Sequence, residues 1–227
     1  MTHWIDRIAV FDLETTGVNV ELDRVVSAHV GELDSNGAVL RHSDWLVDPG
    51  VPIPDAAAAV HGISTERAQA EGQNPAEAVA EIVASLRQFS SEGLAIVAYN
   101  APYDFTLLDR EARRYGVDPF VPEFVIDPLV LDKAVDKYRR GKRTLTVACE
   151  VYGVILDGAH DASADAIAAG RVAQSLVRQK SELAELSPEQ LVARQQAWQR
   201  EQAESFADWK RRNGSPDFIA DIGWPVR

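Results

Sequence analysis

Two acidic residues, Asp12 and Glu14, lie at the end of a largely apolar segment, residues 7–13 (RIAVFDL), and directly after it. The segment predicts a buried strand, and residues two apart on a strand project to the same face. Two carboxylates side by side are costly to bury unless a cation lies between them. Mg²⁺ and Mn²⁺ prefer such hard oxygen ligands. The alternative interpretation is a strand that simply ends and emerges into solvent at Asp12.

A third acid, Asp104, follows a short apolar strand expected at residues 94–99 and begins a helix expected over 104–115. It is a candidate ligand from the carboxyl end of a strand, although taken alone it is more simply interpreted as a routine helix N-cap. A fourth acid, Asp165, lies near the start of an alanine-rich helix expected over 161–176, with His160 on the loop before it.

A histidine near a carboxylate–metal cluster can take a proton from a metal-bound water. The alternative is that His160 is a surface loop residue and Asp165 an acid that favours the helix dipole.

The order of the expected strands and helices indicates how these residues are positioned. Strands are expected at 7–13, 25–33 and 38–47, and the Asp-Ser-Asn-Gly turn at 34–37 predicts an antiparallel meander. A helix is expected to start at Asn74-Pro75, and strands and helices then alternate. This order predicts an α/β fold: three antiparallel strands, then parallel strands, in one mixed sheet flanked by helices.

The pattern changes near residue 181, which divides the chain into residues 1–181 and 182–227. Ser187-Pro188-Glu189-Gln190 is a capping box that begins a long polar helix with a sparse aromatic stripe. We expect residues 182–227 to be a helical C-terminal extension that packs on the first domain or on a partner.

The chain has 227 residues and a net charge of -12, which argues against a broad basic surface that grips nucleic acid. Bound divalent metal would supply positive charge instead. The single cysteine, Cys149, excludes an internal disulfide framework and a cysteine zinc cluster. The sequence has no apolar run of membrane-spanning length, and its first residues lack a signal-peptide pattern. We therefore expect a cytoplasmic protein without a membrane partner.

Three motifs together resemble the DEDDh, or DnaQ-like, family of 3′–5′ exonucleases, which includes the proofreading epsilon subunit of bacterial DNA polymerase III. The motifs are FDLETTG at 11–17, NAPYDF at 100–105 and HDASAD at 160–165, in the order that the family requires. Each acidic motif taken alone has an ordinary structural explanation, whereas the three in order are highly specific. The resemblance spans roughly residues 8–179.

The resemblance implies a ribonuclease H-like fold and a specific chemistry. Asp12, Glu14, Asp104 and Asp165 are expected to hold two divalent ions, Mg²⁺ or Mn²⁺, with His160 as general base. The expected reaction releases nucleoside 5′-monophosphates from the 3′ end of a single strand. DNA is the expected substrate, RNA trimming is the alternative, and a non-catalytic nucleic-acid-binding module of the same fold is a third possibility.

Substrate contacts are expected from residues near these motifs. His61-Gly62-Ile63-Ser64 resembles a family loop beside the 3′-terminal nucleotide, so His61 and Ile63 are expected to contact it. The other expected substrate-binding residues within the motifs are Leu13, Thr15, Thr16, Asn100, Tyr103 and Phe105. A dense basic run at 137–143 either contacts backbone phosphates, through Arg139, Arg140, Lys142 and Arg143, or is a solvated loop. A DNA polymerase or repair protein is a candidate partner.

Overall fold

A computed structural model describes residues 3–156 and 158–227, so the first two residues of the expected first domain and residue 157 lie outside the described part. The described chain contains a mixed sheet in the strand order β3-β2-β1-β4-β5. The strands are β1 (Ile8–Thr15), β2 (Val25–Leu33), β3 (Val39–Leu46), β4 (Ala95–Val97) and β5 (Val125–Ile126). β1, β2 and β3 pair antiparallel, whereas β4 and β5 join in parallel. The predicted α/β mixed sheet is confirmed.

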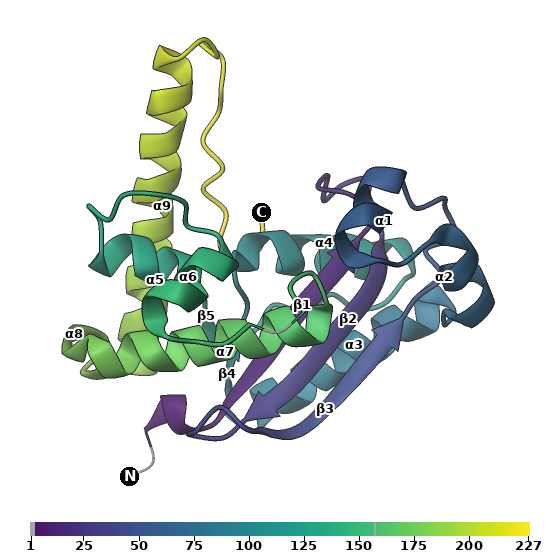
Figure 1. Cartoon of the computed structure of the whole chain (residues 1–227), viewed down its shortest axis with the longest axis horizontal. Coiled ribbons are helices and arrows are strands. Elements are labelled where there is room, and N and C mark those ends of the chain that lie inside the picture. The colour runs from purple at the N-terminus through teal and green to yellow at the C-terminus, as the bar shows by residue number, and fades with distance from the viewer. Residues whose placement is uncertain (1–2, 157) are drawn as a thin grey trace.

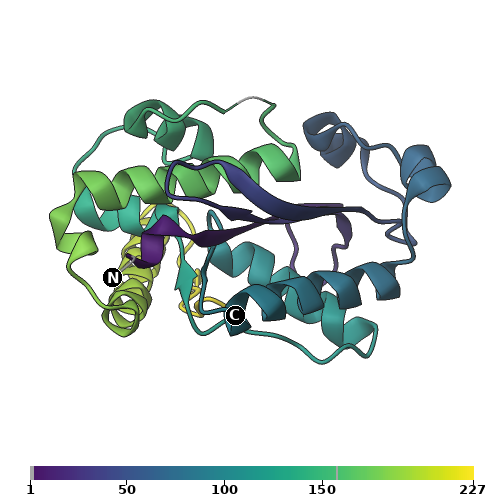
Figure 2. The same ribbon diagram turned by 90° about the horizontal axis from the view of Figure 1, so that it is seen from below.

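Helices cover both faces of the sheet (Figures 1 and 2). α3 (Pro75–Ser91) and α4 (Ala101–Arg114) lie against one face, and α7 (Ala162–Gln179) lies against the other. The remaining helical elements are η1 (Trp4–Asp6), α1 (Asp55–His61), α2 (Thr65–Glu71), α5 (Pro128–Val135), α6 (Leu145–Tyr152), α8 (Ser181–Ala184) and α9 (Pro188–Arg212). Among the described residues, no helix has the length and apolar character needed to cross a membrane.

Alternation along β1 decides which face receives the acids. Phe11 and Leu13 belong to the core beneath α3 and α4, whereas Ile8 and Val10 belong to the core beneath α7. Since successive strand residues point to opposite faces, Asp12 and Glu14 project toward the α7 side. The strand therefore delivers two carboxylates to the face on which α7 rests.

α7 approaches the sheet closely because Gly170 has no side chain. A Cβ atom at this position would lie 2.5 Å from Val10 Cγ1 and 2.7 Å from Leu33 Cδ1. Any larger residue would push the helix away from β1 and β2. The glycine thus fixes the height at which the first turn of α7 presents Asp165 over the sheet.

α4 begins at Ala101, three residues before the predicted start, because its N-terminus is capped from another element. Asn100 adopts a left-handed conformation (φ 63°, ψ 45°) and makes no side-chain cap. The Asp127 carboxylate instead accepts hydrogen bonds from the backbone N–H groups of Asn100 and Ala101, at 3.0 Å each. Asp104 consequently lies inside the first turn of α4 and is not its N-cap.

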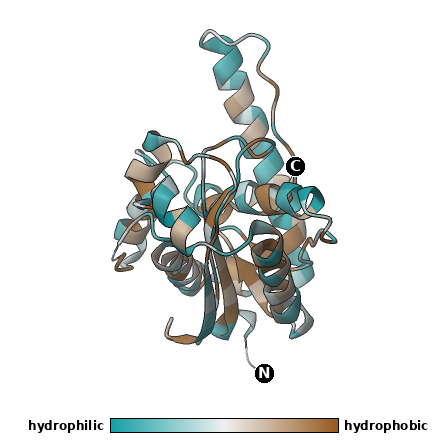
Figure 3. Ribbon diagram, turned by 90° about the vertical axis from the view of Figure 1, so that its right-hand side faces the viewer, coloured by the Kyte–Doolittle hydropathy of each residue, from teal (hydrophilic) through white to brown (hydrophobic). Residues whose placement is uncertain are grey.

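The C-terminal helix α9 packs against the edge of the sheet formed by β5. Leu191 is fully buried, and buried Gln195 donates to the carbonyl of Val125 and accepts from the N–H of Asp127. The following tail returns to the domain, where the backbone N–H of Arg227 donates to Thr106 Oγ1 at 3.0 Å. Figure 3 shows hydrophobic colour concentrated in the strands and adjoining helices, with the far end of α9 standing clear of them.

Candidate active site

Three carboxylates from two elements converge on the α7 face of the sheet. Asp12 and Glu14 come from β1, and Asp165 comes from the first turn of α7. One ligand oxygen from each lies within 4.8 Å of the others, a separation at which a single cation can contact all three. Within the described residues, one carboxylate oxygen of Asp165, Oδ1, is buried without a hydrogen-bond partner.

Asp104 joins the group from α4. Its side chain is only 3% exposed, and its Oδ1 accepts a hydrogen bond from the backbone N–H of Leu13 at 3.2 Å. Because Leu13 lies between Asp12 and Glu14, this bond ties the first turn of α4 to the acid-bearing strand. The structure thus brings together all four acids that the sequence singled out.

The electrostatics of the cluster oppose ionisation. Burial is the largest cause that raises the pKa of Asp12 well above its usual value, followed by the charges of Asp104, Asp165 and Glu14. Burial and the charge of Asp165 likewise raise the pKa of Glu14 to about 8. Burial also raises the pKa values of Asp104 and Asp165. Such a cluster gains most from cations, which neutralise the local negative charge.

His160 is exposed on the loop immediately before α7. It adopts a left-handed conformation (φ 69°), and its backbone N–H donates to Asp165 Oδ2 at 3.3 Å. Left-handed backbone is unfavourable for a residue with a side chain and persists where the surroundings require it. This turn leaves the His160 imidazole solvent-accessible and next to the cluster.

A cavity of about 490 Å³ opens beside the acids, between the α1–α2 region and the N-terminus of α7. Its lining includes Glu14, His61, Ile63, Arg67 and His160. Burial lowers the pKa of His61, which favours its neutral form. The two residues of the HGIS loop predicted to contact substrate therefore share one cavity with a candidate metal ligand and the candidate base.

The threonines after Glu14 are engaged in internal hydrogen bonds. Thr15 Oγ1 lies 2.5 Å from the Tyr103 hydroxyl and donates to the carbonyl of Gly17 at 2.7 Å. Thr16 Oγ1 donates to Asp23 at 2.9 Å and accepts from the backbone N–H of Arg24. The Thr15 contact holds the TTG turn against α4 and the Thr16 bonds hold it against the segment before β2, so both hydroxyls help to shape the site.

Three other residues expected to touch substrate differ in exposure. Leu13 and Phe105 are 5% and 1% exposed, and the Phe105 ring packs against Phe11 with centroids 5.3 Å apart. Asn100 is exposed at the turn into α4. Leu13 and Phe105 therefore pack beneath the site, whereas the Asn100 side chain is accessible to solvent.

The four candidate phosphate contacts in the basic run divide into two pairs. Arg139 and Arg143 donate to the fully buried carboxylate of Asp132, at 2.5 and 2.8 Å, and are largely buried themselves. Arg140 and Lys142 are exposed. The first pair holds the loop onto α5, and the second pair carries the charge that is free to meet phosphate.

Two residues beside the cluster were not singled out from the sequence. Arg67 lines the cavity from α2, and Asp161 caps α7 through hydrogen bonds to the backbone of Ser163 and Ala164. Asp161 also contributes to raising the pKa of Glu14. The HGIS loop was the available signal for Arg67, because the loop's last residue is the N-cap of the helix that carries it.

Comparison with known proteins places this geometry among nucleases. Residues 9–173 match the RNase_T family model, described as "Exonuclease". The chain is 38% identical over 128 residues to the DNA polymerase III subunit epsilon-like protein of Rhodobacter capsulatus, covering 56% of this chain and 17% of that protein. It is 30% identical over 167 residues to the DNA polymerase III PolC-type of Streptococcus suis, covering 72% of this chain and 10% of that protein.

Solved structures share the fold. E. coli exonuclease I in complex with a dT13 oligonucleotide superposes with a TM-score of 0.68 at 23% identity, over 78% of this chain and 42% of that one. The complex with a dA16 oligonucleotide gives a TM-score of 0.69 at 22% identity, over 79% and 42%. The chain thus spans less than half of each exonuclease I chain and about a tenth of the PolC-type polymerase.

Proposed function

The chain belongs to the RNase_T exonuclease family, and from this premise we propose that it is a metal-dependent 3′–5′ exonuclease. The DnaQ-like resemblance predicted from the three motifs is thereby confirmed. The observation that carries the proposed activity is the convergence of Asp12, Glu14 and Asp165 within 4.8 Å, with Asp104 bonded to the same strand. Each of these acids comes from one of the three motifs.

The carboxylates suit divalent ions because of their donor atoms and because one buried oxygen lacks a hydrogen-bond partner in the described chain. The donor set consists of hard oxygens, and the buried Asp165 Oδ1 has no partner within the described chain. Asp12, Glu14, Asp104 and Asp165 would hold two Mg²⁺ or Mn²⁺ ions. Bound there, the ions would polarise the phosphodiester and make a neighbouring water a stronger nucleophile.

The chain's own residues would supply the general base, the cavity for the terminal nucleotide and the contacts to backbone phosphates. The exposed His160 imidazole accepts the proton of the attacking water, since it stands beside the acids with no other described partner for its side chain. The cavity lined by His61, Ile63 and Arg67 receives the 3′-terminal nucleotide. Arg140 and Lys142 contact phosphates farther along the strand.

We further propose single-stranded DNA as the substrate, with nucleoside 5′-monophosphates as products. The supporting observations are the likeness to DNA polymerase III proteins and to exonuclease I bound to dT13 and dA16. RNA trimming is the alternative substrate class. A DNA polymerase or repair protein is the proposed partner, and the cytoplasm the proposed location.

Residues 182–227 are proposed as an extension of the same domain. Gln195 and Leu191 bury α9 against the sheet edge, and the tail reaches Thr106 on α4. A partner would therefore meet the far, exposed part of α9 and not its packed base.

The test uses single-stranded DNA and RNA of equal sequence, labelled at the 3′ or the 5′ end, with Mg²⁺, Mn²⁺ or EDTA. Asp12→Asn and His160→Ala are compared with Asp217→Asn, a control in the exposed tail. We expect stepwise shortening from the 3′ end that EDTA and the first two substitutions reduce at least about 100-fold. Full activity in EDTA or in Asp12→Asn would refute the metal-dependent mechanism. Binding without cleavage in every metal would favour a non-catalytic module.

A further inference from the structure

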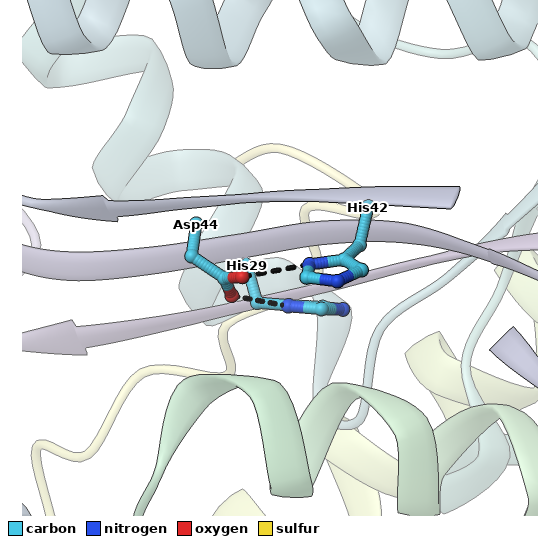
Figure 4. Close-up of side chains that lie close together, drawn as sticks. All are labelled: His29, His42 and Asp44. Atoms are coloured by element: carbon cyan, nitrogen blue, oxygen red, sulfur yellow. Dashed lines mark hydrogen bonds and ion pairs between the residues drawn. The ribbon is translucent and has the colours of Figure 1, made fainter.

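A second group of metal-ligating side chains lies on the same face of the sheet as the carboxylates, away from the three catalytic motifs. It consists of His29 on β2 and of His42 and Asp44 on β3 (Figure 4). One ligand atom from each residue lies within 4.8 Å of the others. Asp44 also lines the cavity proposed for the 3′-terminal nucleotide, but no step of the proposed reaction is assigned to any of the three side chains.

The Asp44 carboxylate already draws both histidines together. Its Oδ1 lies 2.6 Å from His29 Nδ1, and its Oδ2 lies 2.7 Å from His42 Nδ1. Figure 4 shows both rings turned toward this one carboxylate. Two imidazole nitrogens and a carboxylate oxygen are therefore aimed at one small region of space.

The sheet is built to accommodate these rings. His29 is opposite Asp44 and Gly31 is opposite His42 in the β2–β3 register. A Cβ atom at Gly31 would lie 2.7 Å from His29 Nε2 and 3.3 Å from His42 Cβ. The absence of a side chain at Gly31 thus makes the space in which the two histidines lie together.

His29 is an unusual residue for the interior. Its side chain is 1% exposed, and its Nε2 is buried without a hydrogen-bond partner in the described chain. A buried polar atom left unpaired costs free energy, so its position calls for a compensating interaction. Nδ1 of the same ring, which faces Asp44, is the atom that a metal ion can reach.

We propose that His29, His42 and Asp44 form a second metal site, distinct from the catalytic carboxylates, that binds Zn²⁺ or a similar borderline transition-metal ion. Imidazole nitrogen selects Zn²⁺, Co²⁺ or Ni²⁺, whereas Mg²⁺ and Mn²⁺ prefer oxygen sites. Three protein ligands leave a fourth tetrahedral position for water. Solvent reaches the site because His42 and Asp44 are 52% and 50% exposed.

Binding requires one local movement. The two rings are now nearly parallel, 21° apart with centroids 5.5 Å apart, so their nitrogen lone pairs do not yet meet at one point. His42 is half-exposed on edge strand β3 and can rotate, while buried His29 stays in place. The ion replaces hydrogen on both Nδ1 atoms, and each neutral ring then carries its proton on Nε2.

The second site adjoins the first along the sheet, and the two share no ligand. Asp12 pairs with His29, which pairs with Asp44, on three successive strands. At the usual strand spacing this places Asp44 about 10 Å from Asp12. Each site can therefore be disabled by substitution without removing a ligand of the other.

The test follows Co²⁺ binding by visible absorption, with Zn²⁺ as competitor, in the full chain. A nitrogen-containing tetrahedral site absorbs more strongly than an octahedral oxygen site, so the spectrum reports the histidines directly. Asp44→Asn and His42→Ala are chosen because both positions are exposed, and thermal melting followed by circular dichroism verifies their folding. The controls are Asp165→Asn, in the catalytic cluster, and Ser43→Ala, between the two ligands on the other face of β3.

We expect the strong band in the wild type, Asp165→Asn and Ser43→Ala. In His42→Ala and Asp44→Asn we expect loss of the band and Zn²⁺ affinity lower by about 100-fold or more. A band that survives both ligand substitutions, or one that disappears in Asp165→Asn, overturns the proposal. So does a wild-type protein with no strong band at all, which would leave Asp44 as a hydrogen-bonding clamp between two histidines. The readout is independent of nuclease activity.

Discussion

Replacing Glu14 with glutamine should stabilise the metal-free protein. The substitution keeps the size of the side chain and removes its charge. Burial, together with the charges of Asp165 and Asp161, raises the pKa of Glu14 from 4.5 to about 8 in the folded chain. At neutral pH the folded wild type must therefore bind a proton that the unfolded chain releases.

The sign of the effect follows from that difference. Between pH 4.5 and about 8 the folded state holds more protons at Glu14 than the unfolded state, so the free energy of unfolding decreases as pH rises. At pH 7 the interval above the unfolded pKa is about 2.5 pH units, which at about 1.4 kcal/mol per unit corresponds to about 3 kcal/mol. Because Glu14 is partly exposed, screening by solvent reduces the expected gain of Glu14→Gln to about 1–2 kcal/mol.

Urea unfolding in EDTA at several pH values between 4.5 and 8 measures this gain. Glu14→Gln should be more stable than the wild type at pH 7, with a melting temperature about 2–4 °C higher per kcal/mol, and the difference should shrink toward pH 4.5. Saturating Mg²⁺ should reverse the order, since the wild type binds the ion with one more carboxylate. Glu204→Gln, exposed on α9, is the matched control and should change neither curve.

Two results would contradict this reasoning. One is a Glu14→Gln protein that is no more stable than the wild type at pH 7 in EDTA. The other is a gain of equal size at pH 4.5 and pH 7, because a gain from improved packing would not depend on the proton. Either result would mean that the folded chain does not hold these carboxylates under electrostatic strain.

Three further predictions concern the scaffold. Gln195→Leu should lower the free energy of unfolding by about 2–4 kcal/mol in urea, because it strands a buried N–H and a buried C=O at the sheet edge; exposed Gln196→Leu should change it by less than about 0.5 kcal/mol. Arg139→Ala should destabilise the fold by about 1–3 kcal/mol, since the buried carboxylate of Asp132 loses a partner. Exposed Arg140→Ala should leave the melting temperature unchanged. It should instead weaken the binding of labelled single-stranded DNA and reduce the salt dependence of that binding. Deleting residues 187–227 should abolish cooperative thermal unfolding, because α9 covers the β5 edge; a folded and active truncation would argue instead for a separate partner-binding extension.

The central features of the fold follow from local patterns in the sequence. The turn at 34–37 predicted the meander, and Asn74 with Pro75 predicted the start of α3 where the structure has it. These predictions succeeded because hydrogen bonds between near neighbours decide them. The two short helices α1 and α2 were not predicted, because seven residues give too little periodicity to recognise.

The start of α4 was misplaced for a different reason. Its N-terminus is capped by Asp127, which lies 26 residues beyond Ala101. The local sequence around Ala101 cannot predict a cap that comes from another element. The same applies to Arg139 and Arg143, which read as free charge in the sequence. Only the tertiary structure shows that they satisfy Asp132 in the interior.

The sequence by itself determined which acids belong together, because the family's three motifs occur in order and β1 must place Asp12 and Glu14 on one face. Tertiary structure decided the burial of those acids and the charges around them. Burial beneath α7 and the approach of Asp165, set by the close packing at Gly170, raise their pKa values and create the demand for cations. It also brought His29, His42 and Asp44 close together, since pairing across strands depends on register, which becomes defined only when the sheet assembles.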